Sequence, residues 1–166
     1  KKGVSYCALC DAPLFKNKIV AVIGGANSAA CEALILSKFA KKIYIFYKGN
    51  EIKIEAARLE EIKKDKKIEI ITNVNILEVK GNALLNSIVL DKPHNKNTEL
   101  KLDALFVAIG HEPISELAEK IGVKLNSEKE IIINHKTSET NVPGVFAAGD
   151  VTDKQFKQLI IGVADA

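Results

Sequence analysis

The sequence predicts an α/β fold in which helices cover both faces of a parallel β-sheet, with a small antiparallel β-meander inserted as a crossover. Two observations predict it. Short apolar runs rich in isoleucine and valine alternate with helical patterns in the first half of the chain, and strands joined by turn residues follow them. At 166 residues, the chain is long enough for one domain, or for one domain and part of a second.

The first half of the chain alternates strands and helices. A buried strand is expected at residues 18–23, which form a short apolar run. A helix is expected at residues 28–39, with Asn27 or Ser28 near its N-cap and alanines that allow close packing. The next elements are a strand at 43–47, an amphipathic helix laced with Lys and Glu at 54–64, and a strand at 68–72. This order favours a parallel sheet with right-handed crossovers.

The pattern then changes to antiparallel strands. Turn residues at 81–82 and 93–97 separate three short runs, so these runs are expected to pair as a meander. The runs are 75–80, 87–91 and 99–102, and a buried strand at 105–109 returns to the earlier type. The remaining expected elements are a helix at 115–121, a strand at 130–134, a linker at 137–144, a strand ending in a Gly-Asp turn at 145–150, and a helix at 153–166.

The composition argues against several classes of function. Apolar residues make up 47% of the chain, the net charge is +3, and basic residues are interspersed with acids, so no nucleic-acid partner is predicted. No run approaches the roughly 18 apolar residues of a membrane span, and no signal peptide is expected. Three cysteines do not form a secreted disulfide framework. These features favour the cytoplasm and predict no membrane partner.

A glycine-rich turn follows the first expected strand. Dinucleotide-binding proteins with a Rossmann-like sheet carry G-x-G-x-x-G/A at such a turn, and the stretch Gly-Gly-Ala-Asn-Ser-Ala at 24–29 meets the first and last positions. Ala26 stands at the second glycine, where a methyl group would crowd a pyrophosphate. Because amides at a helix N-terminus attract phosphate, the candidate nucleotide-binding residues are Gly24, Gly25, Ala26, Asn27 and Ser28. An ordinary tight strand-to-helix turn is the alternative.

The tip of the second expected strand does not decide between NAD and NADP. NAD sites usually place an acid about 20 residues after the first glycine. This strand instead ends Phe46-Tyr47-Lys48-Gly49. Of the 24 basic residues only Arg58 is an arginine, so 23 are lysines and bidentate phosphate clamps are nearly unavailable. Lys48 and Lys53 could supply point charges, although solvated lysines are the simpler interpretation.

A dithiol spacing stands near the start of the printed sequence. Cys7 and Cys10 form a CxxC motif, in which the first thiol commonly attacks and the second resolves a mixed disulfide. Asp11 follows directly and could act as an acid or base toward a thiol. The alternatives are half of a zinc site or two buried thiols, but no second CxxC or HxxxH completes a metal site. Cys31, in the first expected helix, is interpreted as structural.

The histidines carry weaker signals. His94 and His135 lie in polar stretches and are expected to be solvated. His111 and Gly110 come just after the expected strand at 105–109, at the edge where open parallel sheets bind ligands. Gly110 is therefore a candidate cofactor-binding residue, whereas His111 is interpreted as a loop residue without a catalytic role.

Four blocks together resemble one known family. They read Gly-Val-Ser-Tyr-Cys-Ala-Leu-Cys-Asp at 3–11, the glycine turn at 24–29, Phe-Val-Ala-Ile-Gly-His-Glu-Pro at 106–113, and Thr-Asn-Val-Pro-Gly-Val-Phe-Ala-Ala-Gly-Asp-Val at 140–151. Their order and spacing resemble the low-molecular-weight thioredoxin reductases, a branch of the pyridine nucleotide-disulfide oxidoreductase family, and among these the chain resembles the archaeal-like enzymes. The first block is specific to that branch, and the last is specific to the wider flavoprotein group.

The resemblance implies a flavoenzyme whose FAD domain is interrupted by a nucleotide domain. Electrons would pass from a reduced pyridine nucleotide, NADP or alternatively NAD or another donor, through FAD to the dithiol, and then to thioredoxin or a thioredoxin-like protein. Cys7 and Cys10 would be the redox pair and Asp11 the acid or base. Gly149 and Asp150 would contact FAD, with Asp150 bonded toward its ribityl-phosphate portion, and Gln158 would lie near the isoalloxazine.

Departures from the family pattern qualify this expectation. Phe46-Tyr47-Lys48 replaces a His-Arg-Arg cluster that resembles a 2′-phosphate clamp, and lysine precedes Gln158 where the family has arginine.

Residues 1–136 are expected to be an NAD(P)-binding domain with the CxxC, and 137–166 a C-terminal piece of a second, FAD-binding domain. The chain is therefore expected to be a fragment of a longer, homodimeric enzyme. The alternatives are a ferredoxin- or other-donor-linked flavoprotein reductase of the same fold, and a non-catalytic nucleotide-binding module.

Overall fold

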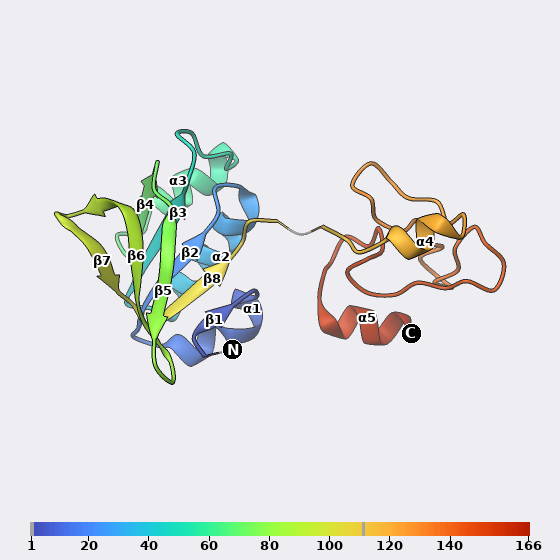
Figure 1. Ribbon diagram of the computed structural model, residues 1–166, viewed down its shortest axis with the longest axis horizontal. Helices are drawn as coiled ribbons and strands as arrows, with labels where there is room; N and C mark the ends of the chain where they lie inside the picture. The colour runs from blue at the N-terminus through green and yellow to red at the C-terminus, as the bar shows by residue number, and fades with distance from the viewer. Residues whose placement is uncertain (1, 111) are drawn as a thin grey trace. The chain divides into compact units, whose positions relative to one another are not determined.

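The computed structural model describes residues 2–110 and 112–166, which fall into two compact units (Figure 1). The first unit ends at Gly110, and the second comprises the described residues that follow it. The compact units thus divide earlier than the expected boundary at 136/137. The assignment of 1–136 and 137–166 to two cofactor domains stays a prediction.

The described part of the first unit is built on a five-stranded parallel sheet in the order β1-β8-β2-β3-β4. The expected α/β class is confirmed, and the predicted strands lie close to their expected bounds. The strands are β1 (Val4–Ser5), β2 (Ile19–Ile23), β3 (Lys42–Tyr47), β4 (Ile68–Thr72) and β8 (Ala104–Val107). The helices are α1 (Ala8–Asp11), the 3-10 turn η1 (Ala12–Phe15), α2 (Asn27–Ser37) and α3 (Ala56–Lys64).

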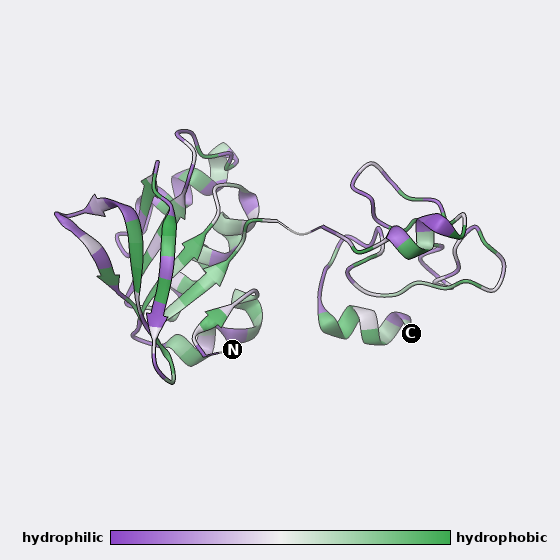
Figure 2. Ribbon diagram, viewed as in Figure 1, coloured by the Kyte–Doolittle hydropathy of each residue, from purple (hydrophilic) through white to green (hydrophobic). Residues whose placement is uncertain are grey.

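One face of the parallel sheet packs against the helices. Alternate side chains of the central strands, such as Val20 and Val22, point to this face and are fully buried together with the small alanines of α2. Phe106 lies edge-to-face with Phe15 at a centroid distance of 5.6 Å. The strands of this sheet are mostly hydrophobic (Figure 2), as expected for strands buried on both faces.

The opposite face is covered by a β-meander, which corrects the expectation of helices on both faces. The meander consists of β5 (Ile76–Gly81), β6 (Leu85–His94) and β7 (Asn97–Lys101), paired antiparallel in that order. Its residues Ile88 and Leu90 pack on Ala21, Phe46 and Leu105 of the parallel sheet. The crossover from β4 to β8 is therefore made of strands, and it fills the place that a second helical layer would take.

The second unit contains little regular structure in the residues that the structure describes. Its helices are α4 (Glu116–Lys120) and α5 (Leu159–Asp165), and Val123, Ile131 and Ile133 form a small core. The strands expected at 130–134 and 145–150 are wrong, because single bridges replace them. Asparagine side chains bind neighbouring amides, as Asn126 binds those of Glu128 and Glu130, and such local bonds compete with a ladder.

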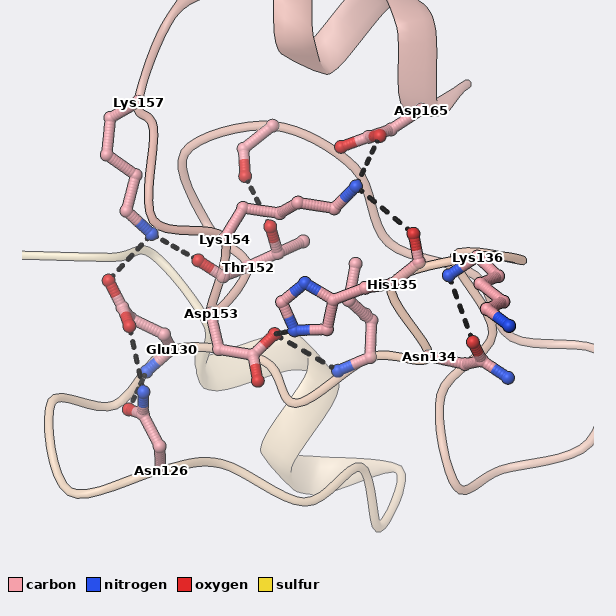
Figure 3. Close-up of polar contacts among 12 residues, drawn as sticks. Asn126, Glu130, Asn134, His135, Lys136, Thr152, Asp153, Lys154, Lys157 and Asp165 are labelled. Atoms are coloured by element: carbon pink, nitrogen blue, oxygen red, sulfur yellow. Dashed lines mark hydrogen bonds and ion pairs between the residues drawn. The ribbon is translucent and has the colours of Figure 1, made fainter.

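Two further expectations for this unit are corrected. The segment 137–144 is folded rather than a free linker, because Val142 packs against the small core and Ser138 donates to the carbonyl of Asp165 at 2.9 Å. The last helix is shorter than the expected 153–166, because residues before it serve in polar contacts (Figure 3). Lys154 pairs with Asp165 at 2.7 Å, and Lys157 contacts the Glu130 carboxylate at 2.7 Å and the Thr152 carbonyl.

The two described histidines have carboxylate neighbours. The His94 side chain is only 14% exposed and lies 3.3 Å from Glu69, so the expectation that it is solvated is wrong. Its ring also packs edge-on against Tyr44. His135 is 54% exposed and lies 3.3 Å from Asp153. His111 lies outside the described residues.

No helix within the described residues has both the length and the apolar character needed to cross a membrane.

Candidate nucleotide cleft and dithiol turn

The pairing of three strands brings the two predicted sites to one edge of the sheet. Ser5 of β1, Phe106 of β8 and Val22 of β2 stand side by side in parallel register. The chain leaves β1 toward the cysteines and leaves β2 toward the glycine turn. Since parallel strands share their carboxyl edge, the dithiol turn and the glycine turn both start from this edge, where open α/β sheets bind ligands.

The glycine turn depends on two close approaches. Gly24 has a φ of +149°, and a Cβ at this position would lie 2.4 Å from the carbonyl oxygen of Ala108. At Gly25, a Cβ would lie 2.3 Å from the Tyr47 ring. At either distance the atoms would overlap. A Cβ at Gly24 would collide with backbone, and one at Gly25 would force the Tyr47 ring to shift, whether or not a ligand binds.

A cleft of about 500 Å³ opens beside this turn. Six of the predicted cofactor-binding residues line it, namely Gly24, Gly25, Ala26, Ser28, Lys48 and Gly110. Asn27 does not line the cleft. Its side chain instead bonds to Glu55, accepting from the backbone amide and donating to the carboxylate, both at 2.8 Å. The volume lies in the range typical of small-molecule and cofactor sites.

The walls of the cleft combine an apolar lining with polar groups at one end. Phe46, Val74 and Ile109 are among its apolar residues, and Lys48 and Lys53 both line it. Ala26 caps α2 without a side-chain hydrogen bond, so no side chain competes for the helix's first amides. The arrangement can attract an anionic group to the start of α2 through the helix dipole and the two lysines.

Tyr47 is a cleft residue whose role sequence analysis did not identify. Its ring lies against Gly25 and Gly49, since a Cβ at Gly49 would come within 2.7 Å of it. The amide of Lys53 donates to the carbonyl of Gly25 at 2.6 Å. The Tyr47 ring and the Lys53 backbone thus both contact the glycine turn. Gly49, two residues after Tyr47, was the only nearby sequence signal of this contact.

The dithiol turn is oxidised and closely hydrogen-bonded. Cys7 and Cys10 form a disulfide, with Cys7 as the N-cap of α1 and Cys10 exposed. The Cys7 Sγ accepts from the Cys10 amide at 3.1 Å. The Ser5 hydroxyl donates to Asp11 Oδ2 at 2.6 Å and accepts from the Cys7 amide at 3.2 Å. The candidate acid Asp11 is therefore held beside the cysteines by a side chain of the preceding strand.

Glu32 of α2 also contacts the dithiol turn. Its Oε2 accepts from the amide of Ala8 at 2.5 Å. Partial burial raises the pKa of the Glu32 carboxyl above its usual value, and the Ala8 bond offsets part of this rise. Sequence analysis did not identify the roles of Ser5 and Glu32. Glu32 reaches the turn only because α2 packs on α1, and nothing in the sequence indicates the contact of Ser5 with Asp11. Cys31 precedes Glu32 and is a partly buried free thiol.

The remaining predicted residues lie in the second unit. Gly149, Asp150 and Gln158 line a shallow pocket of about 530 Å³ together with residues of α5 such as Gly162. Gly149 has a φ of +80°, and a Cβ there would meet only the Cα of Gly162, at 3.8 Å. Its backbone is therefore open to close approach by a ligand. Over the described parts of the chain, no cluster of three or more His, Cys, Asp and Glu side chains could hold a metal ion.

Comparison with known proteins identifies the family to which a chain with this fold and these sites belongs. The model of the family "Pyridine nucleotide-disulphide oxidoreductase" matches residues 1–166, and the chain belongs to this family.

The similar proteins have more specific names than the family. A thioredoxin reductase of Spironucleus barkhanus is 40% identical over 162 residues, which cover 97% of this chain and 53% of that protein. Solved thioredoxin reductases from Streptococcus pyogenes (TM-score 0.88, 28% identity) and Giardia duodenalis (TM-score 0.82, 34% identity) each match 99% of this chain and 54% of their own. The chain thus spans about half the length of these relatives.

The Tyr47 contact predicts a coupled pair of substitutions. Gly25→Ala should lower the free energy of unfolding of the first unit by about 1–3 kcal/mol, because the new methyl group overlaps the Tyr47 ring. Tyr47→Ala should remove most of that penalty. Urea unfolding, monitored by tyrosine fluorescence, measures the free energy of unfolding of the first unit, because all three tyrosines lie in that unit.

A double-mutant cycle over these two positions provides the comparison. The contact is absent if the penalty of Gly25→Ala is the same with and without the Tyr47 ring. Gly122→Ala serves as the control for the readout. Its left-handed backbone, with a φ of +86°, strains only the second unit, so the tyrosine-reported unfolding of the first unit should not change.

Proposed function

We propose that this chain is the dithiol-bearing part of a flavin-dependent thioredoxin reductase. In the whole protein, a reduced pyridine nucleotide would pass electrons through FAD to Cys7 and Cys10, and the resulting dithiol would reduce thioredoxin or a thioredoxin-like protein. The observation that carries the proposal is the Cys7–Cys10 disulfide, which stands with Asp11 at the same sheet edge as the glycine turn.

The chain's own residues account for the thiol chemistry. Reduction of the Cys7–Cys10 bond takes up one electron pair and two protons. The dithiol then attacks a partner disulfide, forming a mixed disulfide that the second cysteine resolves, and the electron pair and the protons leave with the partner thiols. Asp11, fixed by Ser5, would deliver and accept a proton at the sulfur atoms. Cys10 is the more exposed sulfur in the oxidised state.

The cleft residues would hold the nucleotide. The first amides of α2, with Gly24, Gly25 and Ser28, would face its phosphates, and Lys48 would supply a positive charge. The cleft volume and its apolar walls suit such a ligand. When bound, the nucleotide supplies a hydride, and this part of the site fixes its orientation. Asn27 would act indirectly, by tying the start of α2 to Glu55.

The second unit would contribute to the flavin site. Gly149 allows a ligand to approach its backbone, and the exposed Asp150 carboxylate and Gln158 line the same pocket. FAD, when bound, supplies a ring that relays an electron pair between nucleotide and disulfide. Gly110 would contribute to the nucleotide side. We further propose that the whole enzyme is a cytoplasmic homodimer, as its family resemblance suggests.

A donor other than NADPH is the second candidate, and specific observations favour it. Ala26 takes the place of the second glycine of the motif. Phe46-Tyr47-Lys48 stands where the family has a basic cluster, and the Tyr47 ring packs on Gly25. The donor can be identified by bleaching the flavin of the whole protein with NADPH, NADH or reduced ferredoxin in turn. If no donor bleaches the flavin, the proposed function fails.

The redox role of the dithiol predicts a selective loss. In the whole protein, Cys10→Ser should lower the turnover of thioredoxin disulfide by at least about 10³-fold, because no second thiol remains to resolve the mixed disulfide. Cys31→Ser, the matched control at the third cysteine, should retain turnover within about twofold. Unchanged turnover in Cys10→Ser would instead support a flavoprotein reductase that does not need this dithiol.

The position of Lys48 predicts a nucleotide-specific effect. Lys48→Ala should weaken NADPH binding to this chain by about 2–5-fold and leave NADH binding nearly unchanged, because an exposed point charge contributes modestly to a 2′-phosphate. Titration calorimetry with both nucleotides measures it. Lys63→Ala on α3 is the control, as Lys63 does not line the cleft. Equal effects on both nucleotides would exclude Lys48 as the 2′-phosphate contact.

A further inference from the structure

Glu32 connects the helix of the glycine turn with the dithiol turn. It lies on α2, the helix that begins at the glycine turn, and its carboxylate binds the Ala8 amide within the dithiol turn at 2.5 Å. Ala8 directly follows Cys7 and is fully buried. The contact therefore fixes a carboxylate on the amide that directly follows Cys7, and a helix distant in sequence from the CxxC motif supplies it.

The contact has an electrostatic consequence for the reduced state. The Ala8 amide is one of the free donors in the first turn of α1, and the positive end of a helix stabilises a thiolate at its N-terminus. Glu32 occupies this donor and adds a negative charge next to it. Both effects act in the same direction, because each makes a thiolate at Cys7 less favourable.

Other charged groups near the turn are few. Asp11 lies on the turn itself, and its carboxylate accepts from Ser5. Of the elements that pack on α1, η1 contains no charged residue and α2 contains only Glu32 within its bounds. Burial also raises the pKa of Glu32, and the bond from the Ala8 amide offsets part of this rise.

We propose that Glu32 is a positioning residue of the dithiol turn, whose carboxylate fixes the Ala8 amide, disfavours the thiolate at Cys7 and so makes the dithiol a stronger reductant. This inference deepens the proposed function and rests on it. A reduced state that is less stable passes its electron pair more readily to a partner disulfide, while the two thiol protons move to the partner's sulfurs.

The test measures the thiols of this 166-residue chain directly. After reduction with dithiothreitol, the rate of alkylation by iodoacetamide is followed against pH. Glu32→Gln keeps an oxygen acceptor for the Ala8 amide but removes the charge, so the thiolate fraction near neutral pH should rise by about tenfold. The equilibrium with the dithiothreitol couple, measured above the thiol pKa, should shift toward the reduced chain by a similar factor.

Glu78→Gln is the matched control. Glu78 is an exposed carboxylate on β5, in the meander that covers the opposite face of the parallel sheet, and its variant should alkylate as the unmodified chain does. Unchanged alkylation in Glu32→Gln overturns the proposal, as does an equal change in both variants. A change only in Glu32→Ala, which also removes the acceptor, assigns Glu32 a purely structural role and likewise overturns it.

A second measurement covers the case in which Glu32→Gln does not fold. In the unmodified chain, the amide resonance of Ala8 should shift with the titration of the Glu32 carboxyl, because the two groups are hydrogen-bonded. An Ala8 resonance that does not respond overturns the proposal. These outcomes are distinct from failure of the proposed function, which appears as thioredoxin turnover that survives Cys10→Ser in the whole protein.

Discussion

The parallel pairing of β1, β8 and β2 is the constraint on which the rest of the structure depends. It places Ser5, Phe106 and Val22 in one row, so the chain segments that follow β1 and β2 emerge together at the carboxyl edge. One segment carries the disulfide and the other carries the glycine turn. Apolar side chains on the two faces of these strands hold the register, because a slip by one residue would exchange the two buried faces of the sheet.

The two layers that cover the sheet serve the site in different ways. In the helical layer, α2 begins at the glycine turn and packs on α1 of the dithiol turn, where its residue Glu32 binds the Ala8 amide. The meander supplies Val74, Asn75 and Ile76 around β5 to the wall of the cleft. The close approaches at Gly24 and Gly25 make the turn rigid, so the amides of α2 are already oriented for a ligand.

Sequence patterns predicted those elements whose structure depends on residues close to one another in the chain. The strands and helices from β2 to β4 have apolar periods and turn residues of their own, and six predicted cofactor residues line one cleft. Residues whose position depends on tertiary packing could not be predicted. Glu32 and Tyr47 acquire their contacts with Ala8 and Gly25 only through the fold, and Ser5 lies on β1, a two-residue strand too short to give a pattern. In the second unit, asparagine side chains bind the backbone where strands were expected.

The central claim is that Cys7 and Cys10 exchange one electron pair within the whole enzyme. Anaerobic titration of the full-length protein with dithionite, counted against a variant with both cysteines changed to serine, tests it most directly. The account predicts that the unmodified protein takes up one electron pair more per subunit than the variant before free reductant accumulates. Equal uptake by the two proteins would contradict it.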